Sequence, residues 1–139
     1  MSHNIIAAAF ESRLLAWAKA RTKPLKVVSE NETYTPAAAE TYLRAFTLPA
    51  VTASNTLSGD HRLYTGVFQV NIVTPSGMYR TDASGIVDEL AALFPLYLRI
   101  ERAGLVALVM TPVTPGPGIP DGNTFTVPAS FQYRSDTTP

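Results

Sequence analysis

RLYTGVFQVNIVT, residues 62–74, is the stretch that decides the fold of this chain. From Tyr64 onward apolar and polar side chains alternate with a period of two, which indicates a β-strand with one buried and one polar face. Gln69 and Asn71 belong to the polar face, and the turn signal PSG follows at residues 75–77. We predict a long strand whose apolar face the rest of the chain covers. That face consists of Tyr64, Phe68, Val70 and Ile72.

Two amphipathic segments, one on each side of this strand in the sequence, are expected to supply the cover. Residues 4–20 are rich in alanine, which favours a helix. Their apolar residues fall at helical spacing and comprise Ile6, Phe10, Leu14 and Trp17. Residues 81–94 form the second predicted helix, which ends before Pro95. Its apolar stripe comprises Ile86, Leu90, Leu93 and Phe94.

Four shorter segments are expected to be extended. Residues 25–29 and 41–48 are rich in residues that favour strands, and residues 96–101 and 105–111 flank Gly104 in the pattern of a hairpin or bulge. An antiparallel or mixed sheet with both helices on one face buries these stripes most simply. The sequence therefore predicts an α+β fold.

The C-terminal part is predicted to be a loop followed by a strand. Residues 112–123 contain four prolines and three glycines, which is typical of a loop. Residues 124–134 alternate between apolar and polar side chains. Because Pro128 has no N–H donor, we expect this strand to lie at an edge of the sheet or to be interrupted there.

Composition excludes several classes of function. The 139 residues, expected to form the single domain 1–139, carry no net charge and no cysteine, so neither electrostatic capture of nucleic acid nor thiolate chemistry is expected. No apolar run approaches the roughly 20 residues of a membrane helix, and no export signal is recognised. Charged residues make up only 16%, against roughly 25% on average, which leaves neutral surface for a partner.

No enzyme, metal site or cofactor is predicted. Asp60 and His61 could imitate a base with its orienting carboxylate, but no nucleophile pattern accompanies them. Asp82, Asp88 and Glu89 could offer carboxylates to a cation, yet a hard metal needs more oxygen ligands, and a solvated helix face explains them better.

Taken together, the chain resembles the tail terminator proteins of long-tailed phages. The likeness spans nearly the whole chain, and its motifs are structural. The residues that carry it are 64–73 with the turn 75–77, the helix 86–94, the terminal strand 127–134, FESRL at 10–14 and LPA at 48–50.

The resemblance implies a structural virion protein of the phage tail, assembled in the host cytoplasm. Such a subunit would form a homo-oligomeric ring, usually a hexamer, that caps the tail tube and ends its polymerisation. Its expected partners are the major tail tube protein and a head-completion or connector protein. The family has no catalytic residue to carry over. The alternatives are a head–tail joining protein, a small-molecule module with its ligand near Trp17 and Tyr64, and a hydrolase using Asp60 and His61.

Contact with neighbouring subunits is expected from neutral surface and from strand ends. The loop 49–61 is longer than the usual roughly 4–6 residues, and long ordered loops are often functional. Interface candidates are Leu57, Asp60, Arg62, Gln69, Asn71, Arg99 and Arg102. The simpler interpretation of Arg99 and Arg102 is that they are strand-edge charges that discourage aggregation.

Overall fold

The computed structural model describes residues 3–30, 32–36, 40–54, 57, 62–75 and 80–137, without the side chains of residues 80–82 and 137. Within these residues two helices and eight strands are formed. The helices are α1 (His3–Ala20) and α2 (Arg80–Leu93). The strands are β1 (Lys26–Val28), β2 (Tyr42–Pro49), β3 (Arg62–Pro75), β4 (Arg99–Arg102), β5 (Leu105–Val109), β6 (Thr114–Pro115), β7 (Ile119–Asp121) and β8 (Thr124–Thr137).

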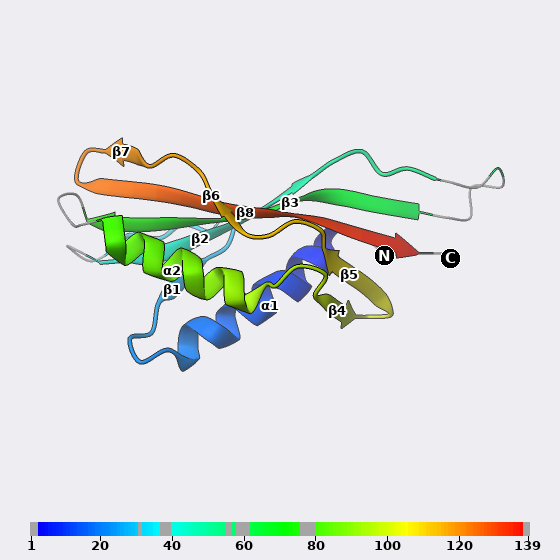
Figure 1. Cartoon of the computed structure of the whole chain (residues 1–139), viewed down its shortest axis with the longest axis horizontal. Helices are drawn as coiled ribbons and strands as arrows, with labels where there is room; N and C mark the ends of the chain where they lie inside the picture. Colours follow the sequence, from blue (N-terminus) through cyan, green and yellow to red (C-terminus); the bar gives the residue numbers. More distant parts are fainter. Residues whose placement is uncertain are drawn as a thin grey trace.

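The strands form one mixed sheet, and both helices lie against the same face of it (Figure 1). The strand order is β1-β2-β3-β8-β5-β4, and β6 and β7 also pair with β8. Only β1 and β2 run parallel; all other pairs are antiparallel. The predicted α+β fold with two helices on one face is confirmed.

The central pair of the sheet is β3 with β8, the two longest strands. They are antiparallel over their full lengths, with Phe68 opposite Phe131 and Ile72 opposite Val127. The alternation seen in the sequence places all four predicted apolar residues of β3 in the core. The predicted strand and its buried face are therefore confirmed.

Four phenylalanines join the helices to this central pair. Phe10 of α1 and Phe94, just after α2, lie against Phe68 and Phe131 of the sheet, with ring centroids 5.0–6.0 Å apart. Aromatic rings at such separations attract one another beyond their burial of area. This cluster fixes how the helix layer sits on the sheet.

The apolar stripes of both helices differ in part from the prediction. Ile6, Phe10 and Leu14 are fully buried, but Ala18 continues the stripe, and Trp17 is only half-buried. The spacing stays at four residues throughout α1, so the position after Leu14 that faces the sheet is 18 and not 17. In α2, Leu93 is likewise only partly buried at the margin of the core.

The expectation for Pro128 was wrong: β8 is a central strand and is not interrupted there. Its carbonyl oxygen accepts a hydrogen bond from Gly116 N. In an antiparallel pair the N and O of one residue point to the same side of the strand. The missing N–H of Pro128 therefore faces the gap between Thr114–Pro115 and Ile119–Asp121, where no ladder bond is needed.

The segment 112–123 was also predicted incorrectly as a loop throughout. It contains β6 and β7, two short strands that pair with successive parts of β8. Prolines at 115 and 120 are tolerated because these strands are flanking and need few donors. By contrast, the predicted hairpin is confirmed: Ala103 and Gly104 have positive φ and join β4 to β5 in a two-residue turn.

Candidate functional site

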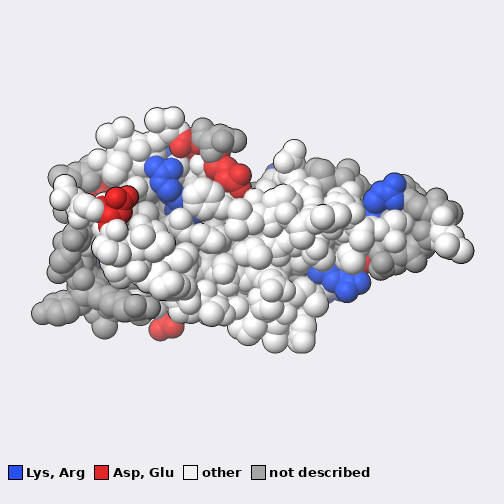
Figure 2. All heavy atoms as spheres, turned by 90° about the horizontal axis from the view of Figure 1, so that it is seen from above, with Lys and Arg blue, Asp and Glu red and all other residues white. Residues whose placement is uncertain are grey.

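The outer face of the sheet is polar but uncharged at its centre. Gln69 and Asn71 point away from both helices, and Gln69 Nε2 donates a hydrogen bond to Asn71 Oδ1 at 2.7 Å. Both side chains are half-buried and neither belongs to the apolar core. In Figure 2 the charged side chains of this face lie toward its ends and leave its middle uncharged. Such a surface suits contact with another neutral surface.

One end of the molecule, which we call the arm, consists of residues 50–54, 62–66 and 133–137. It extends beyond both helices (Figure 1). Ala53 exchanges two backbone hydrogen bonds with Leu63, at 2.7 and 3.0 Å. These bonds hold the chain after β2 along the start of β3.

The arm and the loop beside it carry exposed apolar side chains. Val51 is 88% exposed, and Leu57 is fully exposed. Arg62, another sequence candidate, begins β3 and is half-buried. Asp60 lies outside the described residues, as does His61, so the hydrolase hypothesis based on that pair stays untested.

Arg99 and Arg102 are the first and last residues of β4, at one end of the strand order, and their side chains point to opposite faces of the sheet. Both are exposed, and Arg102 Nη1 donates a hydrogen bond to Ser12 Oγ at 3.1 Å. They are far in the sheet from β3, which carries Gln69 and Asn71. The structure therefore divides the described candidates among the outer face, the arm and the β4 edge.

A histidine at the start of α1 fastens that helix to the arm. The Tyr133 hydroxyl lies 2.6 Å from His3 Nδ1, and Thr52 Oγ1 lies 3.4 Å from His3 Nε2. The imidazole also meets the rings of Tyr64 and Tyr133 edge to face. Burial raises the pKa of Tyr133 to about 12, so its phenol keeps its proton at neutral pH.

His3 should make stability depend on pH. Burial lowers the pKa of His3 below its ordinary 6.5, so the folded protein binds fewer protons than the unfolded chain. Its contribution is complete above pH 6.5 and is lost as the pH falls through the lower pKa of the folded state. Between about pH 7.5 and pH 5 the melting temperature of the wild type should fall more steeply than that of His3→Gln, measured by circular dichroism. Parallel profiles would contradict this role.

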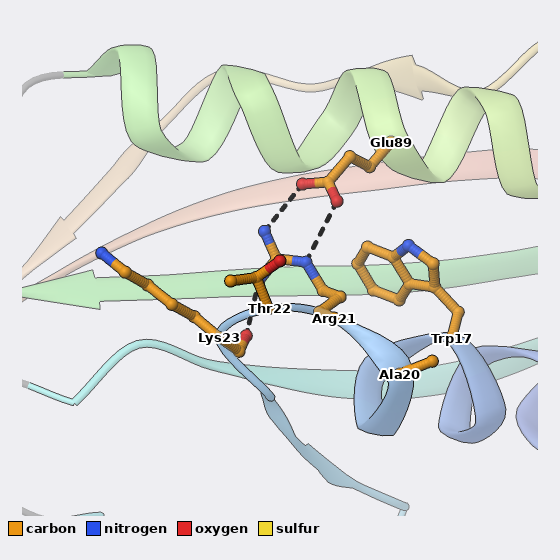
Figure 3. Close-up of a pocket in the computed structure, with 6 residues that line it drawn as sticks. All are labelled: Trp17, Ala20, Arg21, Thr22, Lys23 and Glu89. Atoms are coloured by element: carbon orange, nitrogen blue, oxygen red, sulfur yellow. Dashed lines mark hydrogen bonds and ion pairs between the residues drawn. The ribbon is translucent and has the colours of Figure 1, made fainter.

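The opposite end of α1 lines a shallow cleft of about 490 Å³ (Figure 3). Arg21 makes two hydrogen bonds to Glu89 of α2, at 2.7 and 3.1 Å, and its guanidinium lies 5.3 Å from the centre of the Trp17 ring. This bidentate pair ties the two helices together. Because Arg21 and Glu89 satisfy each other's hydrogen-bonding groups, we interpret this cleft as a structural contact between the two helices.

The described part of the chain forms neither an enclosed ligand cavity between the helices and the sheet nor a metal centre. Trp17 lines the cleft, whereas Tyr64 is buried beside His3, and the aromatic cluster fills the space between helices and sheet. Among the described residues no group of three His, Cys, Asp or Glu side chains could hold a metal ion. Glu89 is engaged by Arg21, and the side chain of Asp82 lies outside the description. Neither described helix has the length and apolarity of a membrane span.

Sequence reasoning missed the acidic residues beside β1. Glu30 and Glu32 follow that strand and are both exposed. From the sequence alone, residues 30–32 are predicted only as a polar turn. The strand order shows that Glu30 and Glu32 lie at the end of the sheet opposite Arg99 and Arg102. His3 and Tyr133 were missed because 130 residues separate them in the chain.

Comparisons with known proteins agree with this architecture. A family model described as phage tail terminator protein matches residues 5–133. One solved structure is 46% identical to the chain, covers 100% of it and 99% of its own length, and superposes with a TM-score of 0.84. No curated protein matches the chain.

Proposed function

This chain belongs to the phage tail terminator family, and from that premise we propose that it forms a ring that caps the tail tube and ends its polymerisation. Members of the family are structural proteins of the phage tail, and membership implies contact with other tail or head proteins. We further propose that the ring is a hexamer and that, once seated, it presents a surface to a head-completion protein.

The family match over residues 5–133 carries this proposal, and the surface of the subunit supports it. A closed ring needs two different patches on each subunit, because each subunit meets its neighbours head to tail. The exposed apolar side chains Val51 and Leu57 and an open edge of the sheet are suited to such patches. The uncharged outer face with Gln69 and Asn71 is a candidate for contact with the tube or a neighbour.

We propose that free subunits associate weakly and that the end of the tube closes the ring. Several copies bound side by side on the tube experience a high effective concentration of one another. The expected result is a concentration-dependent shift toward the hexamer in light scattering, and a stronger shift when tube ends are added. A strict monomer under both conditions would rule out the ring.

Leu57→Asp should block ring closure and leave the subunit folded. Leu57 is fully exposed in the monomer, so a carboxylate there costs little until a neighbour covers it. Light scattering should show loss of the hexamer, while circular dichroism stays unchanged. Ile119→Asp is the matched control, since Ile119 is another exposed apolar residue but lies on β7, away from the arm. Equal assembly of Leu57→Asp and wild type would exclude the loop from the contact.

Electron microscopy of tails assembled without the protein tests the assignment itself. A terminator predicts tails of uncontrolled length in its absence. Tails of normal length that fail to join heads would instead support a head–tail joining protein. Tails that are normal in both respects would contradict both functions.

A further inference from the structure

The path of strand pairing ends in two edge strands, β1 and β4, which lie on the two flanks of α1: Glu11 of that helix contacts Ser29 after β1, and Ser12 contacts Arg102 of β4. The short strands β6 and β7 leave a further edge beside β8. In the described part of the chain β1 pairs only with β2, and β4 pairs only with β5. An open edge presents unpaired backbone groups and invites another chain unless something protects it. The side chains beside each edge therefore decide what can approach it.

The β4 edge is basic. Arg99 and Arg102 are exposed on this strand, with Glu101 as the opposing charge. Arg102 also lines a groove of about 640 Å³ between α1 and β4, and Arg13 contributes a further guanidinium to that groove. Arg13 Nε donates a hydrogen bond to the Leu93 carbonyl oxygen at 2.8 Å, which fixes the position of the Arg13 guanidinium.

The β1 edge carries crowded carboxylates. Glu30 and Glu32 follow the strand, and Glu11 of α1 lies beside them, within 3.4 Å of Ser29 Oγ. Burial raises the pKa of Glu11, and repulsion from Glu30 and Glu32 raises it further, although the Ser29 hydrogen bond opposes both effects. Lys26 pairs with Glu32 at 3.4 Å and offsets part of this charge.

The hydrogen bond from Ser29 N lowers the pKa of Glu32, and Glu30 Oε1 accepts a hydrogen bond from Thr47 N. Both carboxylates are therefore held in place as anions at this edge. A cation arriving from outside would relieve the repulsion that remains at Glu11.

We propose that neighbouring subunits meet edge to edge, with Arg99 and Arg102 of one copy against Glu30 and Glu32 of the next. This inference rests on the proposed ring and names its contact. Oppositely charged patches on opposite edges of one chain repeat head to tail, as a closed ring requires. A twofold dimer would place β4 against β4 or β1 against β1, and thus like charges against each other.

The plain alternative is that these charges only protect the edges from aggregation. Both interpretations place charge on an edge strand, but they differ in what a change of sign does. Protection needs charge of either sign, so reversal would leave the oligomer unaffected. A complementary contact needs opposite signs, so reversal of one edge would disrupt it, and reversal of both would restore it.

The test uses two charge-reversed variants of the full chain. The first is Arg99→Glu with Arg102→Glu, and the second is Glu30→Arg with Glu32→Arg. The matched control reverses two exposed cations elsewhere, Lys19→Glu with Lys23→Glu, and so changes the net charge as much as the first variant does. Sedimentation and light scattering across a concentration series report assembly, with and without tube ends.

Each charge-reversed variant alone should need at least about a tenfold higher concentration to assemble, since like charges then face each other. An equimolar mixture should assemble as well as wild type, because the two variants can alternate around an even-numbered ring. Glu32 Oε2 accepts a hydrogen bond from Ser29 N, and Glu30 Oε1 accepts one from Thr47 N. Glu30→Gln with Glu32→Gln keeps an acceptor oxygen at both positions and replaces the second variant if the charge reversal unfolds the turn; it should weaken assembly less than the reversal does. The control should behave as wild type.

Two results would overturn the proposal, and they are distinguishable from failure of the ring itself. Wild-type assembly by each folded variant alone would show that the edges do not meet. A mixture that stays dissociated would show that they do not complement each other. A wild type that remains monomeric on tube ends would remove the ring and this contact together, whereas a ring indifferent to the reversals would remove only the contact.

Discussion

Phe68→Ala is expected to lower the free energy of unfolding by about 3–5 kcal/mol. Phe68 is fully buried on β3 and touches three other rings, those of Phe10, Phe94 and Phe131. Removal of its ring leaves a cavity between the helix layer and the sheet. The three neighbouring rings come from α1, from the residue that follows α2 and from β8, which limits collapse into the space.

Urea unfolding followed by circular dichroism measures the effect of Phe68→Ala. Gln69→Ala, its neighbour on the opposite face of the same strand, is the matched control and should change stability by much less, because Gln69 lies outside the apolar core. A shift of the melting temperature of Phe68→Ala by only a degree or two would contradict the assignment of this face to the core.

Gly66→Ala is expected to destabilise the arm by about 1–3 kcal/mol, although it adds a single methyl group. A Cβ at this position would lie 2.5 Å from the Tyr133 hydroxyl and 2.6 Å from the Leu48 carbonyl oxygen. The carbonyl is part of the backbone of β2, which pairs with β3 at this point, so it cannot move without disturbing the ladder. The Tyr133 hydroxyl would have to leave His3.

Gly85→Ala is the matched control for Gly66→Ala. A Cβ on Gly85 meets nothing within 4 Å, and alanine favours a helix over glycine by roughly 0.5–1 kcal/mol, so this change should stabilise the protein. Thermal unfolding of both variants should give shifts of opposite sign. An unchanged melting temperature for Gly66→Ala would show that β2 and β8 are farther from β3 at this point than the structure has them.

The sequence alone determined the elements that local periodicity specifies. Alternation along residues 62–74 and 124–134 identified both segments as strands, although the second was expected at an edge of the sheet and is central. Helical spacing identified both helices, and the fold class followed because these stripes need one shared core. The error at Trp17 was small, since the positions 17 and 18 both lie near the same face of a helix.

Only the tertiary structure decided which strands are neighbours, and the interaction surfaces depend on that order. A proline lacks one backbone donor, and whether that loss matters depends on what lies beside it. Pro128 fits in a central strand because its donor-free side faces Gly116, between β6 and β7, where the pairing with β8 is interrupted. Likewise, Glu30 and Arg99 lie at opposite ends of the strand order, and only the pairing between strands shows which edge each one occupies. Periodicity determines the face to which a side chain points, whereas edges and partners arise from pairing between segments distant in the chain.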